Sequence, residues 1–127
     1  MVGVVLVALT VGHLALGGWM LIDPGSFFRE IGPFGVRNDH YTRDAGTFTF
    51  ALGVGFGLAA RWPGWRLGIA GYALMQYTFH AINHLVDIGK ARPRSAGPLD
   101  FASLAVTAGL LGWLVARIAR DRRAERW

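Results

Sequence analysis

The segment from Leu67 to Asp87, "LGIAGYALMQYTFHAINHLVD", combines a long apolar run with polar residues at helical spacing. At about 100° per residue, four of its polar side chains fall within an arc of roughly 100° on one helix face: His80, Asn83, His84 and Asp87. Gln76 and Tyr77 extend this polar stripe along the helix. Because an ionisable side chain facing lipid at depth is costly, we expect the stripe to face a bundle interior or a wet cavity.

The rest of the chain indicates a membrane protein. It has 127 residues, of which 53% are hydrophobic and only 17% charged, and a soluble domain of this size would struggle to bury so much apolar surface. A helix crosses a bilayer with about 20 mainly apolar residues. The sequence therefore predicts an all-α, integral membrane four-helix bundle in a single domain, residues 1–127, with spans at about 2–22, 43–61, 66–88 and 99–118.

The distribution of basic residues predicts the orientation. With four spans both termini lie on one side, and that side holds Arg61, Arg66 and the basic tail 119–127, which includes Arg126. The positive-inside rule makes this side cytoplasmic in a multi-pass protein of the cell (inner) membrane. The tail directly follows a span, so we expect it to bind anionic headgroups of the lipid bilayer and no nucleic acid. Four tryptophans are expected near the interfaces: Trp19, Trp62, Trp65 and Trp127.

A long outer connection, residues 23–41, joins the first two spans. Its "SFFREI" portion, residues 26–31, could form a short interfacial helix with Ser26 as its cap and Phe27 among the side chains that enter lipid. Such a connection could act as a lid over a site beneath it. The first span itself lacks a basic n-region and a small-residue cleavage site, so we expect it to be retained.

The polar stripe has the donor types of a metal site. His80 and His84 lie one helical turn apart, a spacing at which two imidazoles can bind one divalent metal ion, and Asp87 lies a further turn along. His40 and Asp44 enter the second span at the same outer end and could complete the ligand set. Cysteine is absent, so the sequence predicts no haem c and no iron–sulfur cluster.

The same side chains could instead act without a metal. His80 and Asp87 could serve as acid and base, while Asn83, Arg43 and Tyr77 orient a substrate. His13, in the middle of the first span, is expected at the depth of His80 and could join the catalytic set. Asp100, which opens the fourth span, could add a carboxylate at the rim of the site. The structural alternatives are that His13 only hydrogen-bonds a neighbouring helix, and that Asp44 and Asp100 cap their helices.

A glycine face on the second span predicts a close helix contact. Gly46, Gly53 and Gly57 fall on or near one face, and the last two form a small-xxx-small pair. The third span and another protomer are both open as the neighbour.

Three motifs carry a resemblance to a known group: "DPGSFFREIGPFG" after the first span, "NDHYTRDAG" opening the second and "HAINHLVDIG" closing the third. They resemble small four-helix membrane proteins common in actinobacteria, the DoxX-like and DUF4345-type group. The resemblance implies a four-helix membrane fold and makes a role beside membrane redox complexes conceivable. It supplies no substrate, and no defined DoxX catalytic motif carries over to this chain.

Three function hypotheses follow. The first is a metal-dependent or acid–base membrane enzyme acting on a lipid or other hydrophobic small molecule that enters laterally. The second is a non-enzymatic accessory subunit that joins a homo-oligomer or a larger membrane redox complex through its glycine face. The third is a component of a proton or ion pathway formed by His13, His80, His84 and Asp87.

Overall fold

The computed structural model describes residues 1–124, which are helical throughout apart from short connections. The elements are α1 (Val2–Ile22), α2 (Pro24–Glu30), α3 (Asp39–Arg61), the 3₁₀ helix η1 (Pro63–Trp65), α4 (Arg66–Val86) and α5 (Ala96–Ala124). The predicted all-α class is confirmed for this part of the chain. The first six residues of the basic tail continue α5, whereas Arg126 and Trp127 lie outside the described residues.

Two of the helices, α1 and α5, are long and apolar enough to cross a membrane, as judged by length and composition. Helices α3 and α4 have similar lengths but interrupt their apolar runs with the polar residues described above. The two helices that meet this criterion therefore stand at the two ends of the chain.

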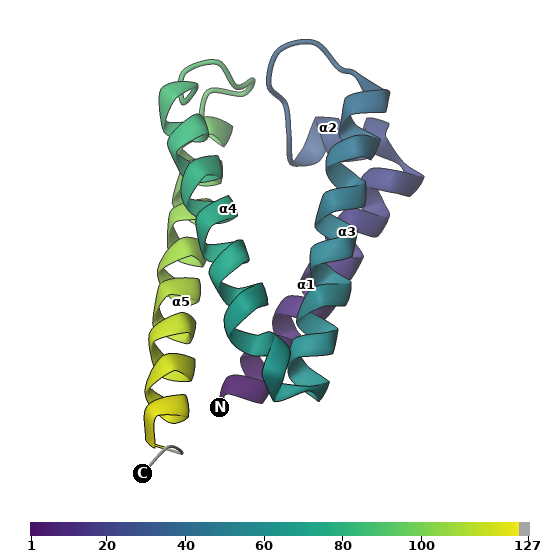
Figure 1. Ribbon diagram of the computed structural model, residues 1–127. Helices are drawn as coiled ribbons and strands as arrows, with labels where there is room; N and C mark the ends of the chain where they lie inside the picture. The colour runs from purple at the N-terminus through teal and green to yellow at the C-terminus, as the bar shows by residue number, and fades with distance from the viewer. Residues whose placement is uncertain (125–127) are drawn as a thin grey trace.

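The four long helices form two antiparallel pairs, α1 with α3 and α4 with α5 (Figure 1). The pairs approach each other where η1 and the two ends of the chain lie, which we call the closed end, and they diverge toward α2, which we call the open end. Arg122 near the end of α5 secures the closed end, since its Nη2 donates to the carbonyls of Pro63 at 3.2 Å and Gly64 at 3.1 Å.

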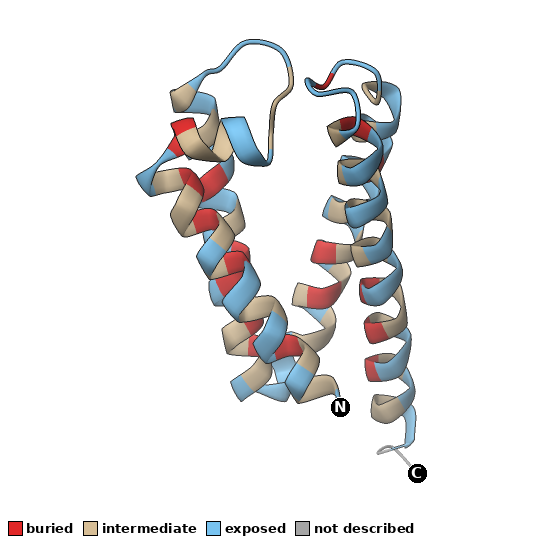
Figure 2. Ribbon diagram, turned by 180° about the vertical axis from the view of Figure 1, so that it is seen from behind, coloured by how far each residue is buried: buried red, intermediate tan, exposed pale blue. Residues whose placement is uncertain are grey.

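The apolar core follows the facing sides of the helices (Figure 2). Its largest fully buried side chains are Leu6, Phe56, Leu111 and Leu114. Small residues also belong to the core on α3 and α4, the helices on either side of η1. Ala59, Ala70 and Ala73 are fully buried. Alanines permit the close approach of α3 and α4 beside their short connection.

Glycines set the contact between α1 and α3. A Cβ atom on Gly17 would lie 2.6 Å from the backbone nitrogen of Phe50, and one on Gly53 would lie 2.9 Å from a backbone nitrogen of α1. Gly46 and Gly57 also face α1. The neighbour of the glycine face is therefore α1, and neither alternative expected from sequence, the third span or another protomer, is what covers it.

Helix α2 turns the chain at the open end. Asp23 is its N-cap, because the carboxylate Oδ1 accepts from the Ser26 N–H at 3.0 Å; the expectation of Ser26 as cap was wrong by one turn. The Ser26 hydroxyl accepts instead from Trp19 Nε1 at 2.6 Å. The Ser26 backbone N–H and hydroxyl hold the pKa of Asp23 below its ordinary value of 3.8.

The connection after α2 reaches across to the other helix pair. Phe34 forms an isolated antiparallel bridge with Ala91, and the Arg92 N–H donates to the Pro33 carbonyl at 3.1 Å. The loops of the two pairs thus meet above the space where the helices diverge.

Candidate functional site

A cavity of about 780 Å³ lies between the two helix pairs near the open end. Every α helix contributes to its wall. Apolar side chains come chiefly from α1, α2 and α3, and they include Leu16, Met20, Phe27, Phe48 and Leu52. Phe27 was expected to enter lipid, but it lines the cavity instead, with its ring packed edge-on against Trp19 at a centroid distance of 5.8 Å.

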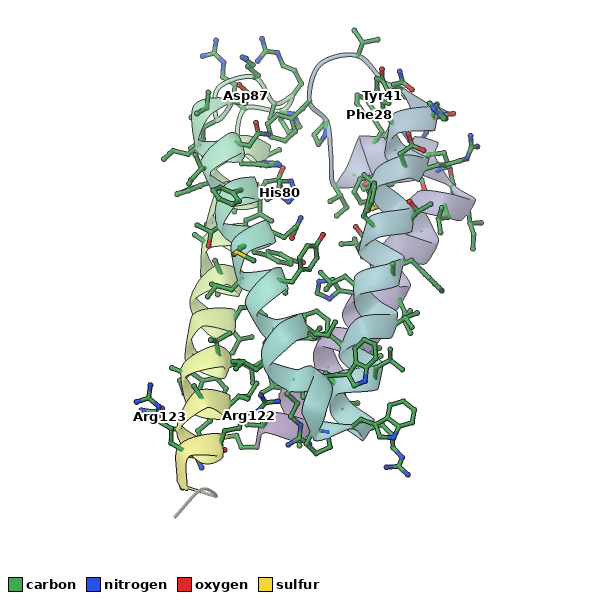
Figure 3. All side chains as sticks on the ribbon, viewed as in Figure 1. Phe28, Tyr41, His80, Asp87, Arg122 and Arg123 are labelled. Atoms are coloured by element: carbon green, nitrogen blue, oxygen red, sulfur yellow. The ribbon has the colours of Figure 1, made fainter. Side chains whose placement is uncertain are left out.

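The polar stripe of α4 forms the opposite wall. Tyr77, His80, Asn83, His84 and Asp87 all line the cavity. Figure 3 shows His80 projecting from α4 toward the other helix pair, with Asp87 above it where the helix ends. Three turns of one helix therefore present hydrogen-bonding groups to an apolar wall.

His13 and Tyr77 meet at the inner end of the cavity. The His13 ring contacts the Leu9 carbonyl through Nδ1 at 2.7 Å and the Tyr77 hydroxyl through Nε2 at 2.8 Å. A carbonyl can only accept, so Nδ1 carries a proton, and in the neutral imidazole the Tyr77 hydroxyl donates to Nε2. His13 is only 6% exposed. Both ring nitrogens are therefore occupied, as the helix-linking alternative predicted, and His13 is level with Tyr77 rather than with His80.

His80 and His84 form an aromatic cluster with the roof of the cavity. Their ring centroids are 4.8 Å apart with the rings edge to face, and the centroid of the Phe34 ring lies 4.8 Å from that of His84 in the same arrangement. The Nδ1 atom of His84 is buried and has no hydrogen-bond partner among the described residues. The imidazole of His84 is thus fixed in position by two rings while one polar atom stays unpaired.

Two carboxylates reach the cavity. Asp87 pairs with the Lys90 ammonium at 2.7 Å, at the rim where α4 ends. Asp100 comes from α5, and its Oδ2 is buried with no partner among the described residues. Because α5 begins at Ala96, Asp100 lies in the second turn, so the expectation that it caps this helix was wrong.

The sequence analysis missed two residues of α5, Ser103 and Thr107. They line the cavity together with Asp100, which was expected as a carboxylate at the rim, and the spacing of three and then four residues places all three on one helix face. That spacing was a readable signal. It was overlooked because small hydroxyl residues in a helix have common local roles.

Three expected site residues lie elsewhere. His40, Arg43 and Asp44 are exposed, and none of them lines the cavity. His40 Nε2 stands 3.5 Å from Asp44 Oδ2, with the two side chains 79% and 54% exposed. The structure thus separates this pair from His80, His84 and Asp87. Within residues 1–124 no group of three or more His, Asp or Glu side chains is placed to hold a metal ion, so the divalent metal stays a prediction.

The ionisable groups that line the cavity include carboxylates and imidazoles. Within the described part of the chain, its lining includes two carboxylates and three imidazoles but no arginine or lysine. Lys90 offsets Asp87 at the rim, whereas Asp100 has no such counter-ion. The arrangement can bind a molecule with an apolar body and a polar end, and it offers no fixed positive charge to an anion.

Comparison of the chain with family models, with curated proteins and with solved structures gives no match. The resemblance to DoxX-like proteins therefore stays a prediction that rests on the quoted motifs.

Proposed function

We propose that this protein is a four-span integral membrane protein that binds an amphipathic small molecule in the cavity between its two helix pairs. The observation that carries the proposal is the cavity of about 780 Å³ with one apolar and one polar wall. Small-molecule sites typically measure about 300–1,000 Å³ and combine apolar walls with a few polar groups that fix orientation.

The outer surface of all four long helices supports the membrane setting. Large apolar side chains are exposed on each of them, with Val4 of α1, Phe48 of α3, Phe79 of α4 and Val106 of α5 each at least 70% exposed. Contiguous apolar surface of this kind is rare on soluble monomers and normal on helices that face lipid. We therefore extend membrane crossing from α1 and α5 to α3 and α4.

The proposed orientation places the closed end in the cytoplasm. Arg61, Arg66, Arg117 and Arg122 gather at that end of the fold, in accordance with the positive-inside rule. The open end, with α2 and the cavity, then lies at the outer face.

Single cysteines test this orientation, because the chain has no native cysteine. Val36 is 93% exposed at the open end, and Gly64 in η1 has open space beside it. In intact cells, V36C should react with a membrane-impermeant maleimide and G64C should react only after permeabilisation. The reverse labelling would overturn the orientation, and labelling of both in intact cells would overturn the four-span topology.

The ligand would enter from the bilayer. Phe48 of α3 and Tyr72 of α4 line the cavity and are also 73% and 53% exposed. We therefore expect the ligand to enter between these two helices, from the plane where a membrane would be.

A bulky residue in the cavity wall tests ligand binding. Ser103 is exposed and lines the cavity, so the indole of S103W should occupy the space of a ligand without disturbing the buried core. V106W is the matched control, because Val106 is 73% exposed on the same helix and does not line the cavity. Native mass spectrometry from lipid nanodiscs should detect bound monolauroylglycerol, laurate or laurylamine with wild type and V106W but not with S103W. Equal occupancy in all three proteins, or none in wild type, would overturn the proposal.

A catalytic version of this function is favoured by one observation. His80 and His84 both line the cavity with ring centroids only 4.8 Å apart, and imidazole exchanges protons near neutral pH. If the protein is an acid–base enzyme, a total lipid extract incubated with the reconstituted wild type should gain a new species by mass spectrometry. H80Q should not produce it. An unchanged lipid profile with wild type would overturn catalysis and leave binding intact.

The accessory-subunit hypothesis loses its proposed contact. The glycine face of α3 is covered by α1 within the chain, so a partner complex would have to bind through another surface. Binding of a small molecule requires no such surface, and the cavity favours it.

A further inference from the structure

Two buried polar atoms of the cavity, at the open end of the fold, have no hydrogen-bond partner within residues 1–124. They are Nδ1 of His84 on α4 and Oδ2 of Asp100 on α5. The neighbouring hydroxyls of α5 are already used, since Ser103 donates to the Asp100 carbonyl at 2.8 Å and Thr107 donates to the Ser103 carbonyl at 2.8 Å. Among the buried side-chain atoms of the described residues, the unsatisfied hydrogen-bonding capacity is thus concentrated on one imidazole nitrogen and one carboxylate oxygen.

Both side chains line the same cavity, His84 from α4 and Asp100 from α5. The rings of Phe34 and His80 each lie with their centroids 4.8 Å from that of His84. Buried polar groups without partners are rare in folded proteins because each forfeits its hydrogen bonds to water. A group supplied by a ligand would satisfy both.

The chemistry of the pair selects the ligand group. A head group with hydroxyls can donate to the Asp100 carboxylate and, at the same time, either accept from Nδ1–H of His84 or donate to an unprotonated Nδ1 through a second hydroxyl. A carboxylate or phosphate can only accept, and it would face the charge of Asp100 with no arginine or lysine in the described lining to offset it. An ammonium can only donate, so it would satisfy His84 Nδ1 in one tautomer only, whereas a hydroxyl-bearing head group satisfies both tautomers.

We propose that the polar end of the ligand is an uncharged, hydroxyl-bearing head group, of the kind a neutral glycerolipid carries, bound between His84 and Asp100. This inference rests on the proposed function, because it names the ligand class of the same cavity. The acyl chain would lie along the apolar wall that includes Leu16, Leu52 and Leu104.

Three probes with tails of matching length test the head group in nanodiscs: monolauroylglycerol, laurate and laurylamine. Monolauroylglycerol should bind at least about tenfold more tightly than the other two, the ratio expected when a hydrogen bond to a charged group is gained. Native mass spectrometry or calorimetric titration gives the three affinities.

Two variants connect the preference to the named atoms. H84A should weaken monolauroylglycerol binding about tenfold. D100N removes the charge at constant size, so laurate should bind more tightly to D100N than to wild type. This gain cannot arise from misfolding. H40A and D44N are matched controls, because this exposed pair lies off the cavity, and neither should change any affinity.

The outcomes separate the two proposals. If laurate or laurylamine binds wild type as tightly as monolauroylglycerol does, or if D100N does not improve laurate binding, the head-group inference is overturned while the cavity remains a binding site. If none of the three probes binds, the proposed function falls as well.

Discussion

The contact between α1 and α3 is closely packed, whereas the space between the two helix pairs contains a cavity. In the first, glycines bring the backbones so close that a Cβ atom on Gly17 would lie 2.6 Å from Phe50. In the second, aromatic and polar side chains leave a cavity of about 780 Å³. His13 lies at the boundary, since its helix packs on α3 while its ring bonds to Tyr77 across the gap.

The difference shows how a small helical bundle can keep a cavity open. Within a membrane, helices associate mainly by close packing and hydrogen bonds, because lipid chains are as apolar as the helices. The glycine contact makes one rigid pair. The second pair is attached through the apolar core and Arg122 toward the closed end, through the His13–Tyr77 hydrogen bond and through the Phe34–Ala91 bridge at the open end. The space between the last two attachments is left for a ligand.

The largest expected effect comes from breaking the close contact. In G17L the new side chain meets the backbone of Phe50, so α1 and α3 must separate at a cost of about 3 kcal/mol. G12L on the same helix is the control, because nothing lies within 4 Å of that position. Thermal unfolding in detergent, followed by circular dichroism, compares them. Equal stability of the two variants would contradict the packing of α1 on α3.

An intermediate effect is expected from the bond that crosses the gap. Y77F removes the hydroxyl that donates to His13 Nε2 and leaves that buried nitrogen without its partner, at a cost of about 1 kcal/mol. Y41F is the control, since Tyr41 is 69% exposed and away from the cavity. The same unfolding assay applies. If Y77F matched Y41F, the hydrogen bond would not contribute to joining the two pairs.

The helices and one wall of the site could be predicted from the sequence, because both depend on local periodicity. The stripe from Tyr77 to Asp87 follows the helical repeat, and α4 presents it to the cavity as a unit. The apolar runs likewise gave the positions of the four long helices within a few residues.

The composition of the opposite walls could not be predicted, because it depends on how each helix is rotated against its neighbours. His40 and Asp44 lie at the open end as expected, yet they face away from the cavity. The cause is the glycine contact: Gly46 faces α1, and Asp44, two residues earlier, projects about 200° around the helix from it. The position of a residue along the bundle could be predicted from the sequence. The direction in which its side chain points could not, because it depends on which neighbouring helix packs against it.

The smallest expected effect concerns α2, which covers the open end. The Ser26 N–H holds the pKa of Asp23 below 3.8, and a carboxylate whose pKa is lowered by folding stabilises the fold above its unfolded pKa. This contribution is therefore complete above pH 3.8 and is lost as the pH falls through the lower pKa of the folded state. Hydrogen exchange of the amides from Phe27 to Glu30 should accelerate slightly, beyond its intrinsic pH dependence, as Asp23 becomes protonated.

Two substitutions at Asp23 make this test specific. D23N keeps a side-chain oxygen that can accept from Ser26, so it should retain the cap and lose the acid sensitivity. D23A should show fast exchange in α2 at every pH, without altering exchange in the α1–α3 contact. If D23N stayed as acid-sensitive as wild type, the response would have to come from another carboxylate, and Asp39 is the nearest candidate at this end because Arg37 lowers its pKa through a paired hydrogen bond.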